Sequence, residues 1–152
     1  AARVVPARTT ARLLRVGCGE ANCRAVNVLE LLDELGHERT QDIDCVVGVT
    51  NADLTYLDRD FVFGMSDARR GLAAMSLYRL RPDPPDSALL LARAAKVFTH
   101  ELGHVLGLDH CSRPGCAMRF SPTAQSLDTR SAHYCEQHES QLKATWPRLF
   151  SA

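Results

Sequence analysis

Apolar residues recur with helical spacing near the beginning of the chain, between Ala25 and Leu35. Their side chains fall on one face of a helix: Val28, Leu31, Leu32 and Leu35. Gly36 follows directly, and glycine commonly ends a helix because it adopts a positive φ without strain. This pattern predicts an amphipathic helix over residues 25–35.

A longer helical pattern runs from Ala88 to Leu106. Its apolar stripe is formed by Leu90, Ala94, Val97, Phe98, Leu102 and Val105. The proline-rich segment 81–86 precedes it, and Asp86 or Ser87 can supply the N-cap. Gly103 inside this pattern disfavours the helix by about 1 kcal/mol relative to alanine, which predicts a close neighbouring backbone there.

Short apolar runs between the two helices predict strands, because they are rich in residues that favour extended backbone. The predicted strands are Asp44–Thr50, Phe61–Phe63 and Leu72–Leu80. The polar residues 51–60 are interpreted as turns and residues 64–71 as a loop. Two weaker strand candidates, Arg3–Val5 and Ala11–Val16, lie near the start of the chain.

Regular structure is sparse after Cys111. Residues 113–115 predict a turn, and Ser121–Thr123 and Asp128 mark short helical turns. Residues from Cys135 to Trp146 predict a final helix, which ends before Pro147. At 152 residues the whole chain, 1–152, is expected to form a single domain.

Composition argues against two classes of partner. The formal net charge is zero and the basic residues are scattered, so no nucleic-acid footprint is expected. No stretch is apolar for long enough to span a bilayer, and the first residues lack the apolar core of a signal peptide. Six cysteines in such a chain favour metal binding in a reducing compartment, so a cytoplasmic location is expected.

Three histidines in the second helical segment have the spacing of metal ligands. The stretch His100–His110 reads HExxHxxGxxH. His100 and His104 are four residues apart, so both imidazoles leave one face of a helix and can share a Zn²⁺. Gly107 permits a sharp turn that brings His110 back to the same ion.

Glu101 lies beside this site in a position to accept a proton. Three nitrogen ligands leave the fourth zinc position for water, which is the arrangement of a catalytic zinc. Glu101 is expected to be the general base that takes a proton from the zinc-bound water. The alternative, an amphipathic core helix carrying surface histidines, explains neither the spacing nor the turn.

The residues that follow make this sequence resemble the archaemetzincins, a family of metzincin zinc peptidases. Metzincins carry a methionine in a tight turn beneath the zinc, and Met118 is in the matching position. The family pattern continues as HCxxxxCxM and a later CxxC pair, here Cys111, Cys116 and Cys135 with His138 in place of the last cysteine. The resemblance implies an α+β metzincin-like fold. Its parts would be a small twisted mixed sheet with an antiparallel edge strand, a long active-site helix, a Met-turn and a C-terminal helix.

The same resemblance implies a second, structural zinc that ties together residues 111–152. Its ligands would be Cys111, Cys116, Cys135 and His138, because Cys₃His is a common zinc set. His133 is the alternative fourth ligand. His138 is favoured, because a step of three residues from Cys135 suits one helical face.

Three cysteines remain outside this set. Cys45 is expected to be a core thiol. Cys18 and Cys23 are interpreted as free thiols, with a third zinc or a disulfide as alternatives.

By resemblance, the third predicted strand is the sheet edge that pairs with an extended substrate above the zinc. Its residues are Ala73, Ala74, Met75, Ser76 and Leu77. The alternative is a sheet edge without a ligand.

The sequence therefore predicts a zinc metallopeptidase, expected to be a monomer, that acts on peptide or protein substrates as an aminopeptidase or a restricted endopeptidase. Two alternatives remain open. One is a non-catalytic zinc-dependent binding module, and the other is a zinc amide hydrolase acting on a small non-peptide substrate.

Overall fold

All five residues of the strand Leu72–Ser76 (β6) are buried in the computed structural model, which describes residues 25–41, 43–57 and 59–150. A strand covered on both faces lies inside a sheet. Accordingly, β6 pairs in parallel with β2 (Val46–Thr50) and antiparallel with β5 (Gly64–Asp67). The sheet order is β2-β6-β5, so β5 is an edge strand.

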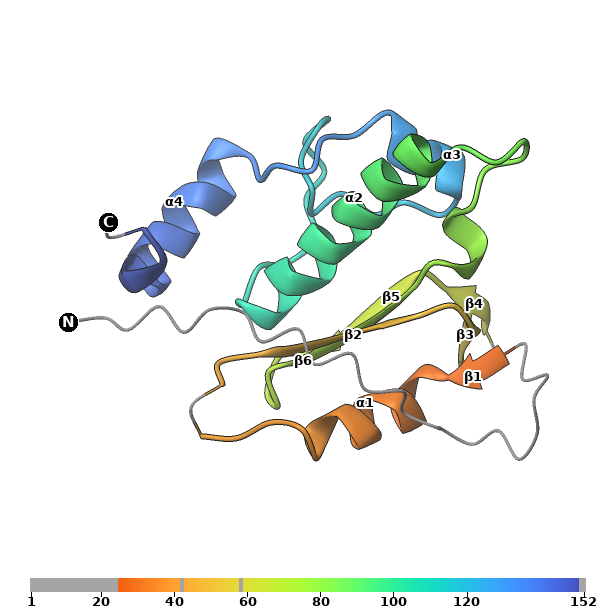
Figure 1. Cartoon of the computed structure of the whole chain (residues 1–152). Helices are drawn as coiled ribbons and strands as arrows, with labels where there is room; N and C mark the ends of the chain where they lie inside the picture. Colours follow the sequence, from red (N-terminus) through yellow and green to blue (C-terminus); the bar gives the residue numbers. More distant parts are fainter. Residues whose placement is uncertain (1–24, 42, 58, 151–152) are drawn as a thin grey trace.

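The prediction that the third strand forms the sheet edge is therefore wrong. Residues 73–76 belong to the central strand β6, Leu77 follows it, and Tyr78–Leu80 forms a 3-10 turn, η1. The reason is the alternation of side chains. Leu72 and Ala74 pack on the face covered by α1 (Val28–Gly36), whereas Met75 packs on the opposite face with Val97 of α2 (Ser87–Val105). Figure 1 shows α1 and α2 on opposite sides of the strands.

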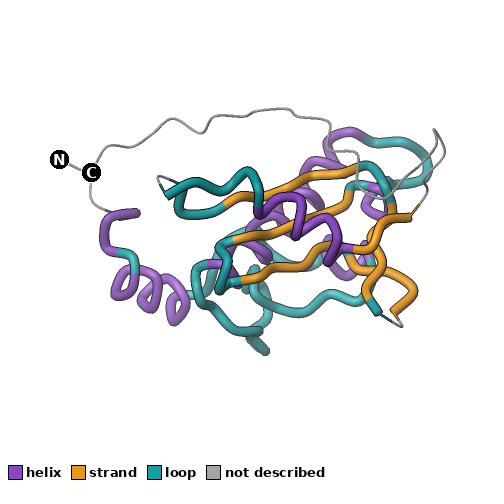
Figure 2. Tube along the Cα trace, turned by 90° about the horizontal axis from the view of Figure 1, so that it is seen from below, coloured by secondary structure: helices purple, strands orange, loops and turns teal. Residues whose placement is uncertain are grey.

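A second three-stranded sheet forms from the start of the first predicted helix, the predicted turns at 51–60 and part of the predicted strand Phe61–Phe63. Its strands are β1 (Ala25–Asn27), β3 (Asp53–Tyr56) and β4 (Arg59–Val62), in the order β1-β3-β4. Figure 2 shows the strands in orange and the helices in purple. β3 reads as polar because Asp53 begins it, but the Asp53 carboxylate accepts hydrogen bonds from Arg79 Nε at 2.8 and 2.9 Å. A single sheet was expected, but the six strands of the described residues divide between two.

Capping residues set where the first two predicted helices begin. The Asn27 side chain accepts a hydrogen bond from Leu29 N at 2.9 Å, so α1 begins at Val28 and residues 25–27 are free to pair as β1. The Asp86 side chain accepts from the backbone N–H groups of Ala88 and Leu89, so Asp86 caps α2. None of the described helices has the length and apolar character that a membrane crossing requires.

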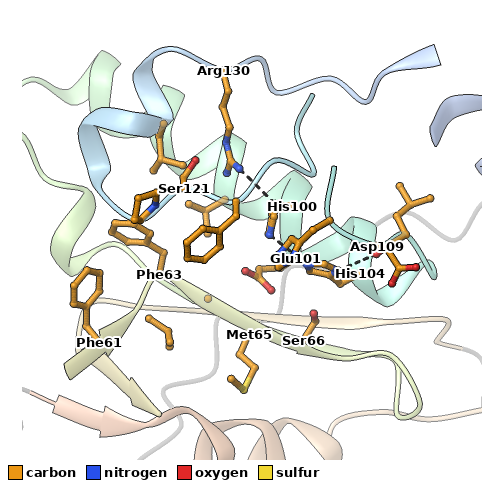
Figure 3. Close-up of a pocket in the computed structure, with 18 of the residues that line it drawn as sticks. Phe61, Phe63, Met65, Ser66, His100, Glu101, His104, Asp109, Ser121 and Arg130 are labelled. Carbon is orange, nitrogen blue, oxygen red and sulfur yellow. Dashed lines mark hydrogen bonds between the residues drawn. The ribbon is translucent and has the colours of Figure 1, made fainter. Parts of the chain in front are cut away.

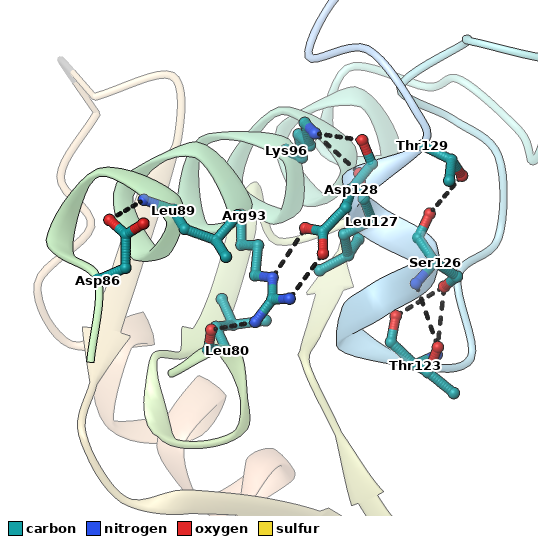
Figure 4. A network of polar contacts seen from close by, with 10 residues as sticks. All are labelled: Leu80, Asp86, Leu89, Arg93, Lys96, Thr123, Ser126, Leu127, Asp128 and Thr129. Carbon is teal, nitrogen blue, oxygen red and sulfur yellow. Dashed lines mark hydrogen bonds and ion pairs between the residues drawn. The ribbon is translucent and has the colours of Figure 1, made fainter. Parts of the chain in front are cut away.

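The segment after α2 is fastened to that helix by cationic side chains. Arg93 makes two hydrogen bonds, of 2.8 and 2.6 Å, to the carboxylate of Asp128 at the end of α3 (Ala124–Asp128). Lys96 Nζ donates to the carbonyls of Leu127 and Asp128 (Figure 4). These contacts hold residues 124–130 against the middle of α2, one turn before the histidines.

A third core lies beneath the end of α2 and holds the C-terminal part of the chain. It contains Leu108, Cys116, Met118 and Leu142. Leu142 belongs to α4 (Glu136–Thr145), the predicted C-terminal helix, which is followed by the 3-10 turn η2 (Pro147–Leu149). From α4 and the residue after it, Gln141 Nε2 donates to the Gly107 carbonyl at 3.2 Å and Trp146 Nε1 donates to that of Leu106 at 3.0 Å.

Gly103 is explained by a side chain, not by the neighbouring backbone that the sequence predicted. A methyl group at this position would overlap the sulfur of Met118 and lie 3.1 Å from the ring of Tyr134. Met118 is fully buried, so its thioether has little room to move. Gly103 therefore lets the turn formed by residues 116–119, called the Met118 turn, lie directly beneath α2.

We expect Gly103→Ala to destabilise the protein although alanine is the better helix former. Overpacking a core typically destabilises by about 1–3 kcal/mol, and helix propensity returns about 1 kcal/mol. The net loss should be up to about 2 kcal/mol, measured by urea unfolding. In a double-mutant cycle, Gly103→Ala should destabilise the protein less when residue 118 is already alanine than when it is methionine. A single variant more stable than wild type would contradict this packing.

Candidate metal centres

His100 and His104 leave one face of α2 and meet His110 beyond the end of the helix. The helix ends as predicted, with Gly107 at a φ of +91°. Ring centroids lie 4.7 Å apart for His100 and His104, 5.2 Å for His100 and His110, and 4.8 Å for His104 and His110. One nitrogen from each ring lies within 4.8 Å of the others. The structure thus brings the three predicted ligands together.

Backbone carbonyls orient two of these rings for metal binding. His100 Nδ1 lies 2.8 Å from the Ala117 carbonyl and His104 Nδ1 lies 2.8 Å from that of Leu108. A carbonyl only accepts, so each Nδ1 carries the hydrogen and each Nε2 is left with a lone pair. The two Nε2 atoms are 3.2 Å apart. Two lone pairs facing each other at this distance suit a shared cation, and nitrogens about 2.0–2.1 Å from a tetrahedral zinc are separated by roughly this distance.

Burial keeps His100 in the neutral form that binds metals. Desolvation lowers the pKa of His100 to about 4, and the charges of His104, Arg130 and His110 act in the same direction. Burial also lowers the pKa of His104. Neutral imidazole is the ligand form, so the donor set and its protonation both fit Zn²⁺.

Glu101 points into the same cleft with its side chain almost fully enclosed (Figure 3). Burial raises the pKa of its carboxyl to about 7, while a hydrogen bond with Ser66 and the charge of Arg130 act in the opposite direction. A carboxyl with a pKa near neutrality can both take up and release a proton. The chemistry expected of a general base therefore agrees with its surroundings.

The edge strand β5 lies directly beside the Glu101 side chain. A side chain at Gly64 would place its first carbon 2.7 Å from Glu101 Cγ and 2.8 Å from Oε1, so only glycine leaves room for the carboxylate. Gly64, Met65 and Ser66 line the cleft together with the histidines. Sequence reasoning missed β5 because its four residues, GMSD, show no apolar alternation.

The cleft has a volume of about 860 Å³, and its lining is partly apolar. Aromatic and aliphatic side chains from three parts of the chain line it: Phe61, Phe63, Val97, Phe120 and Leu127. Arg130 also lines the cleft, and Figure 3 shows its side chain extending toward His100. No local pattern pointed to Arg130, because a single arginine after a polar turn has no distinguishing neighbours.

A second cluster joins the turn at 111–118 to the start of α4. Cys116 Sγ lies 3.4 Å from His138 Nδ1, Cys135 Sγ lies 3.7 Å from the same atom, and Cys111 Sγ lies 4.0 Å from Cys135 Sγ. All four potential ligand atoms lie within 4.8 Å of one another. Ligands about 2.0–2.3 Å from a tetrahedral zinc are about 3.4–3.8 Å apart, so the donor set and its spacing fit a closed zinc site.

The beginning of α4 favours the charged form of one of these thiols. Cys135 is the N-cap of α4, and hydrogen bonds from the backbone N–H groups of His138 and Gln137 lower the pKa of its thiol. A thiolate is the form that binds zinc. Cys135 is therefore not inside the helix, and His138 reaches it from the first turn.

The remaining candidates lie apart from both clusters. His133 is exposed, and its carbonyl accepts a hydrogen bond from Ala117 N at 2.8 Å. Cys45 is partly buried, its pKa is raised by that burial, and it is in neither cluster. Cys18 and Cys23, like the strand candidates before them, fall outside the described residues.

The backbone couples the two clusters. Cys111 follows His110 directly, and its N–H donates to the Met118 carbonyl at 2.9 Å. Met118 lies fully buried under α2. A change at the cysteine cluster can therefore reach His110 through one peptide bond.

Comparison with known proteins agrees with this geometry. The sequence model of peptidase family M54 matches residues 4–144. The archaemetzincin of Pyrococcus abyssi is 42% identical over 108 residues, which cover 68% of this chain and 57% of that protein. The chain therefore spans little more than half the length of this relative.

Solved structures show the same fold. The crystal structure of archaemetzincin from Methanopyrus kandleri superposes with a TM-score of 0.75 at 34% identity, covering 82% of this chain and 68% of that one. A zinc-dependent peptidase from Methanocorpusculum labreanum gives a TM-score of 0.66 at 29% identity, covering 76% and 71% of the two chains. The α+β, metzincin-like fold is thereby confirmed, and the chain belongs to the archaemetzincins, peptidase family M54.

Proposed function

We propose that this chain is a zinc-dependent peptidase in which Glu101 is the general base and the cysteine cluster holds a second, structural zinc. One observation supports the catalytic part above all: the Nε2 lone pairs of His100 and His104 converge beside the enclosed carboxyl of Glu101. The similarity to a protein described as a zinc-dependent peptidase supports the same conclusion.

In this proposal His100, His104 and His110 hold the catalytic ion. Zinc at these nitrogens would supply Lewis acidity, which activates a water and polarises the substrate carbonyl. Glu101 accepts the proton of that water and then delivers it to the departing amine. The carboxyl is held for both transfers because Gly64 leaves it room and Ser66 hydrogen-bonds to it.

The edge strand β5 is the proposed binding site for the substrate backbone. It pairs with β6 along one side, and Gly64, Met65 and Ser66 line the cleft above the histidines. An extended peptide can add to such an edge through main-chain hydrogen bonds, which fixes its scissile bond over the ion. This assigns to β5 the role that the family resemblance implied for residues 73–77.

The direct test is hydrolysis by the zinc-loaded protein against matched peptide and acyl-amide libraries. Cleavage of internal or amino-terminal peptide bonds, lost on zinc removal and restored by zinc, is the expected result. Cleavage of small acyl-amides alone would indicate an amide hydrolase. Tight peptide binding without cleavage of either library would indicate a binding module and overturn the proposal.

The two ions should differ in how readily they leave. The three-histidine site is open on one side and lies in a cleft, whereas the cysteine cluster is partly to fully buried and has four protein ligands. Dialysis against a mild chelator should therefore remove about one zinc per chain and abolish hydrolysis, while the fold persists. Metal analysis and circular dichroism measure this. Loss of the thiolate-bound zinc first would contradict the assignment.

A further inference from the structure

Arg130 is a buried cation beside the three-histidine site that the proposed mechanism does not use. Only 6% of the residue is exposed, and its Nε–H has no hydrogen-bond partner among the described residues. Burying a guanidinium with an unsatisfied donor is unfavourable. The contacts of the two Nη atoms must therefore explain why this guanidinium is buried.

The rest of the guanidinium touches three parts of the site at once. Arg130 Nη2 donates to the Lys96 carbonyl of α2 at 3.3 Å. Arg130 Nη1 donates to the Arg119 carbonyl, in the turn directly after Met118. The same Nη1 lies 3.4 Å from His100 Nδ1. One planar group thus bridges the active-site helix, the Met118 turn and the edge of a ligand ring.

The contact with the turn matters because the turn orients His100. The Ala117 carbonyl, two residues before Arg119, holds His100 Nδ1 at 2.8 Å and so directs Nε2 toward the other histidines. His100 Nδ1 has two polar neighbours, and the shorter contact is to Ala117. If Nδ1 accepted a hydrogen bond from Arg130 instead, Nε2 would carry the hydrogen and be unable to bind a metal.

We propose that Arg130 is a positioning residue of the three-histidine metal site. It holds the Met118 turn against α2 at the distance that keeps the Ala117 carbonyl on His100 Nδ1. This inference rests on the proposed function, because it assumes that the histidines bind a metal. A planar guanidinium can reach both carbonyls in fixed directions, whereas a lysine ammonium is a single flexible point. The positioning of the turn therefore depends on the planar shape of the Arg130 guanidinium as well as on its charge.

Lys96 provides a matched control on the same segment. Lys96 Nζ binds the carbonyls of Leu127 and Asp128, so Lys96→Met also removes one positive charge and part of the attachment of residues 124–130 to α2. Its side chain touches neither the Met118 turn nor His100 in any contact the structure describes. Arg130 contacts the carbonyl of Lys96 and not its side chain, so that hydrogen bond survives the substitution.

The experiment measures metal affinity and not hydrolysis. Apo-protein receives one equivalent of Zn²⁺ to fill the cysteine cluster and is then titrated with Co²⁺, whose d–d absorption reports the histidine site. Orienting partners of metal ligands typically change affinity about 10–100-fold. We expect Arg130→Met to weaken Co²⁺ binding about 10-fold or more and to alter the d–d spectrum, whereas Lys96→Met stays within about twofold of wild type.

Arg130→Lys keeps the positive charge, and it replaces Arg130→Met in the Co²⁺ titration if the methionine variant fails to fold. It should bind Co²⁺ more weakly than wild type and more tightly than Arg130→Met. Wild-type affinity in both Arg130 variants would overturn the inference. Equal weakening by Arg130→Met and Lys96→Met would overturn it too, because the effect would then belong to the segment as a whole. No Co²⁺ binding by wild type at the histidines would remove the proposed function itself, and this inference with it.

Discussion

Replacing Glu101 by glutamine is expected to lower kcat/KM by at least about 10²–10⁴-fold, the range that general acid–base catalysis contributes. The amide has the shape of the carboxyl and fits the space that Gly64 leaves, but it cannot take up a proton. Metal content and thermal midpoint should stay at wild-type values, because Glu101 belongs to neither cluster of candidate metal ligands. Steady-state kinetics with a peptide found in the screen, beside metal analysis, measure both.

Glu101→Asp is the matched control for this substitution. It keeps a carboxylate but withdraws it by one methylene, so its activity should lie between wild type and Glu101→Gln. This ranking of activities distinguishes the effect of losing the carboxylate from the effect of moving it. Wild-type kcat/KM in Glu101→Gln would show that another group takes the proton.

The two clusters of candidate metal ligands were predictable from the sequence because their geometry is local. His100 and His104 are joined by one helical turn, and the positive φ of Gly107 returns His110 to them over only a few residues. The step of three from Cys135 to His138 was equally local. Cys135 proved to be the cap of α4 and not part of its face, and the two residues still meet.

The sheet was harder to predict because its strands are stabilised by partners far away in sequence. Asp53 opens β3 only because Arg79 neutralises it, 26 residues later. The resemblance placed residues 73–77 at the sheet edge, whereas α1 and α2 cover the two faces of β6 and the strand is central. Hydrophobic alternation cannot tell a central strand from an edge strand when the covering helices lie elsewhere in the chain.

The residues that support the proposed active site could not be recognised from any local sequence pattern. Gly64 is required by the Glu101 side chain, and the Ala117 carbonyl orients His100 through a backbone atom that every residue possesses. Arg130 reaches His100 from 30 residues away. Such contacts depend on how elements pack, so they become visible only in the folded structure.

Replacing His138 by alanine should release the proposed structural zinc or weaken it severely, and it should destabilise the fold. His138 is buried, with Nδ1 3.4 Å from Cys116 Sγ and 3.7 Å from Cys135 Sγ, so alanine leaves three cysteines and a gap. Loss of a structural metal is among the few single changes that remove about 4 kcal/mol or more. For a chain of this size that corresponds to a thermal midpoint lower by about 8–16 °C.

The loss should also reach the catalytic site, which makes the prediction specific. α4 and Trp146 after it hold the carbonyls of Leu106 and Gly107, at the turn that leads to His110, and Cys111 follows His110 directly. Loosening α4 should therefore lower zinc occupancy of the histidines as well. His133→Ala is the matched control, since His133 is exposed and outside the cluster, and His138→Cys should restore a four-ligand site. Zinc stoichiometry and thermal midpoints of the three variants decide the matter: metal loss in His133→Ala with full retention in His138→Ala would transfer the fourth ligand to His133.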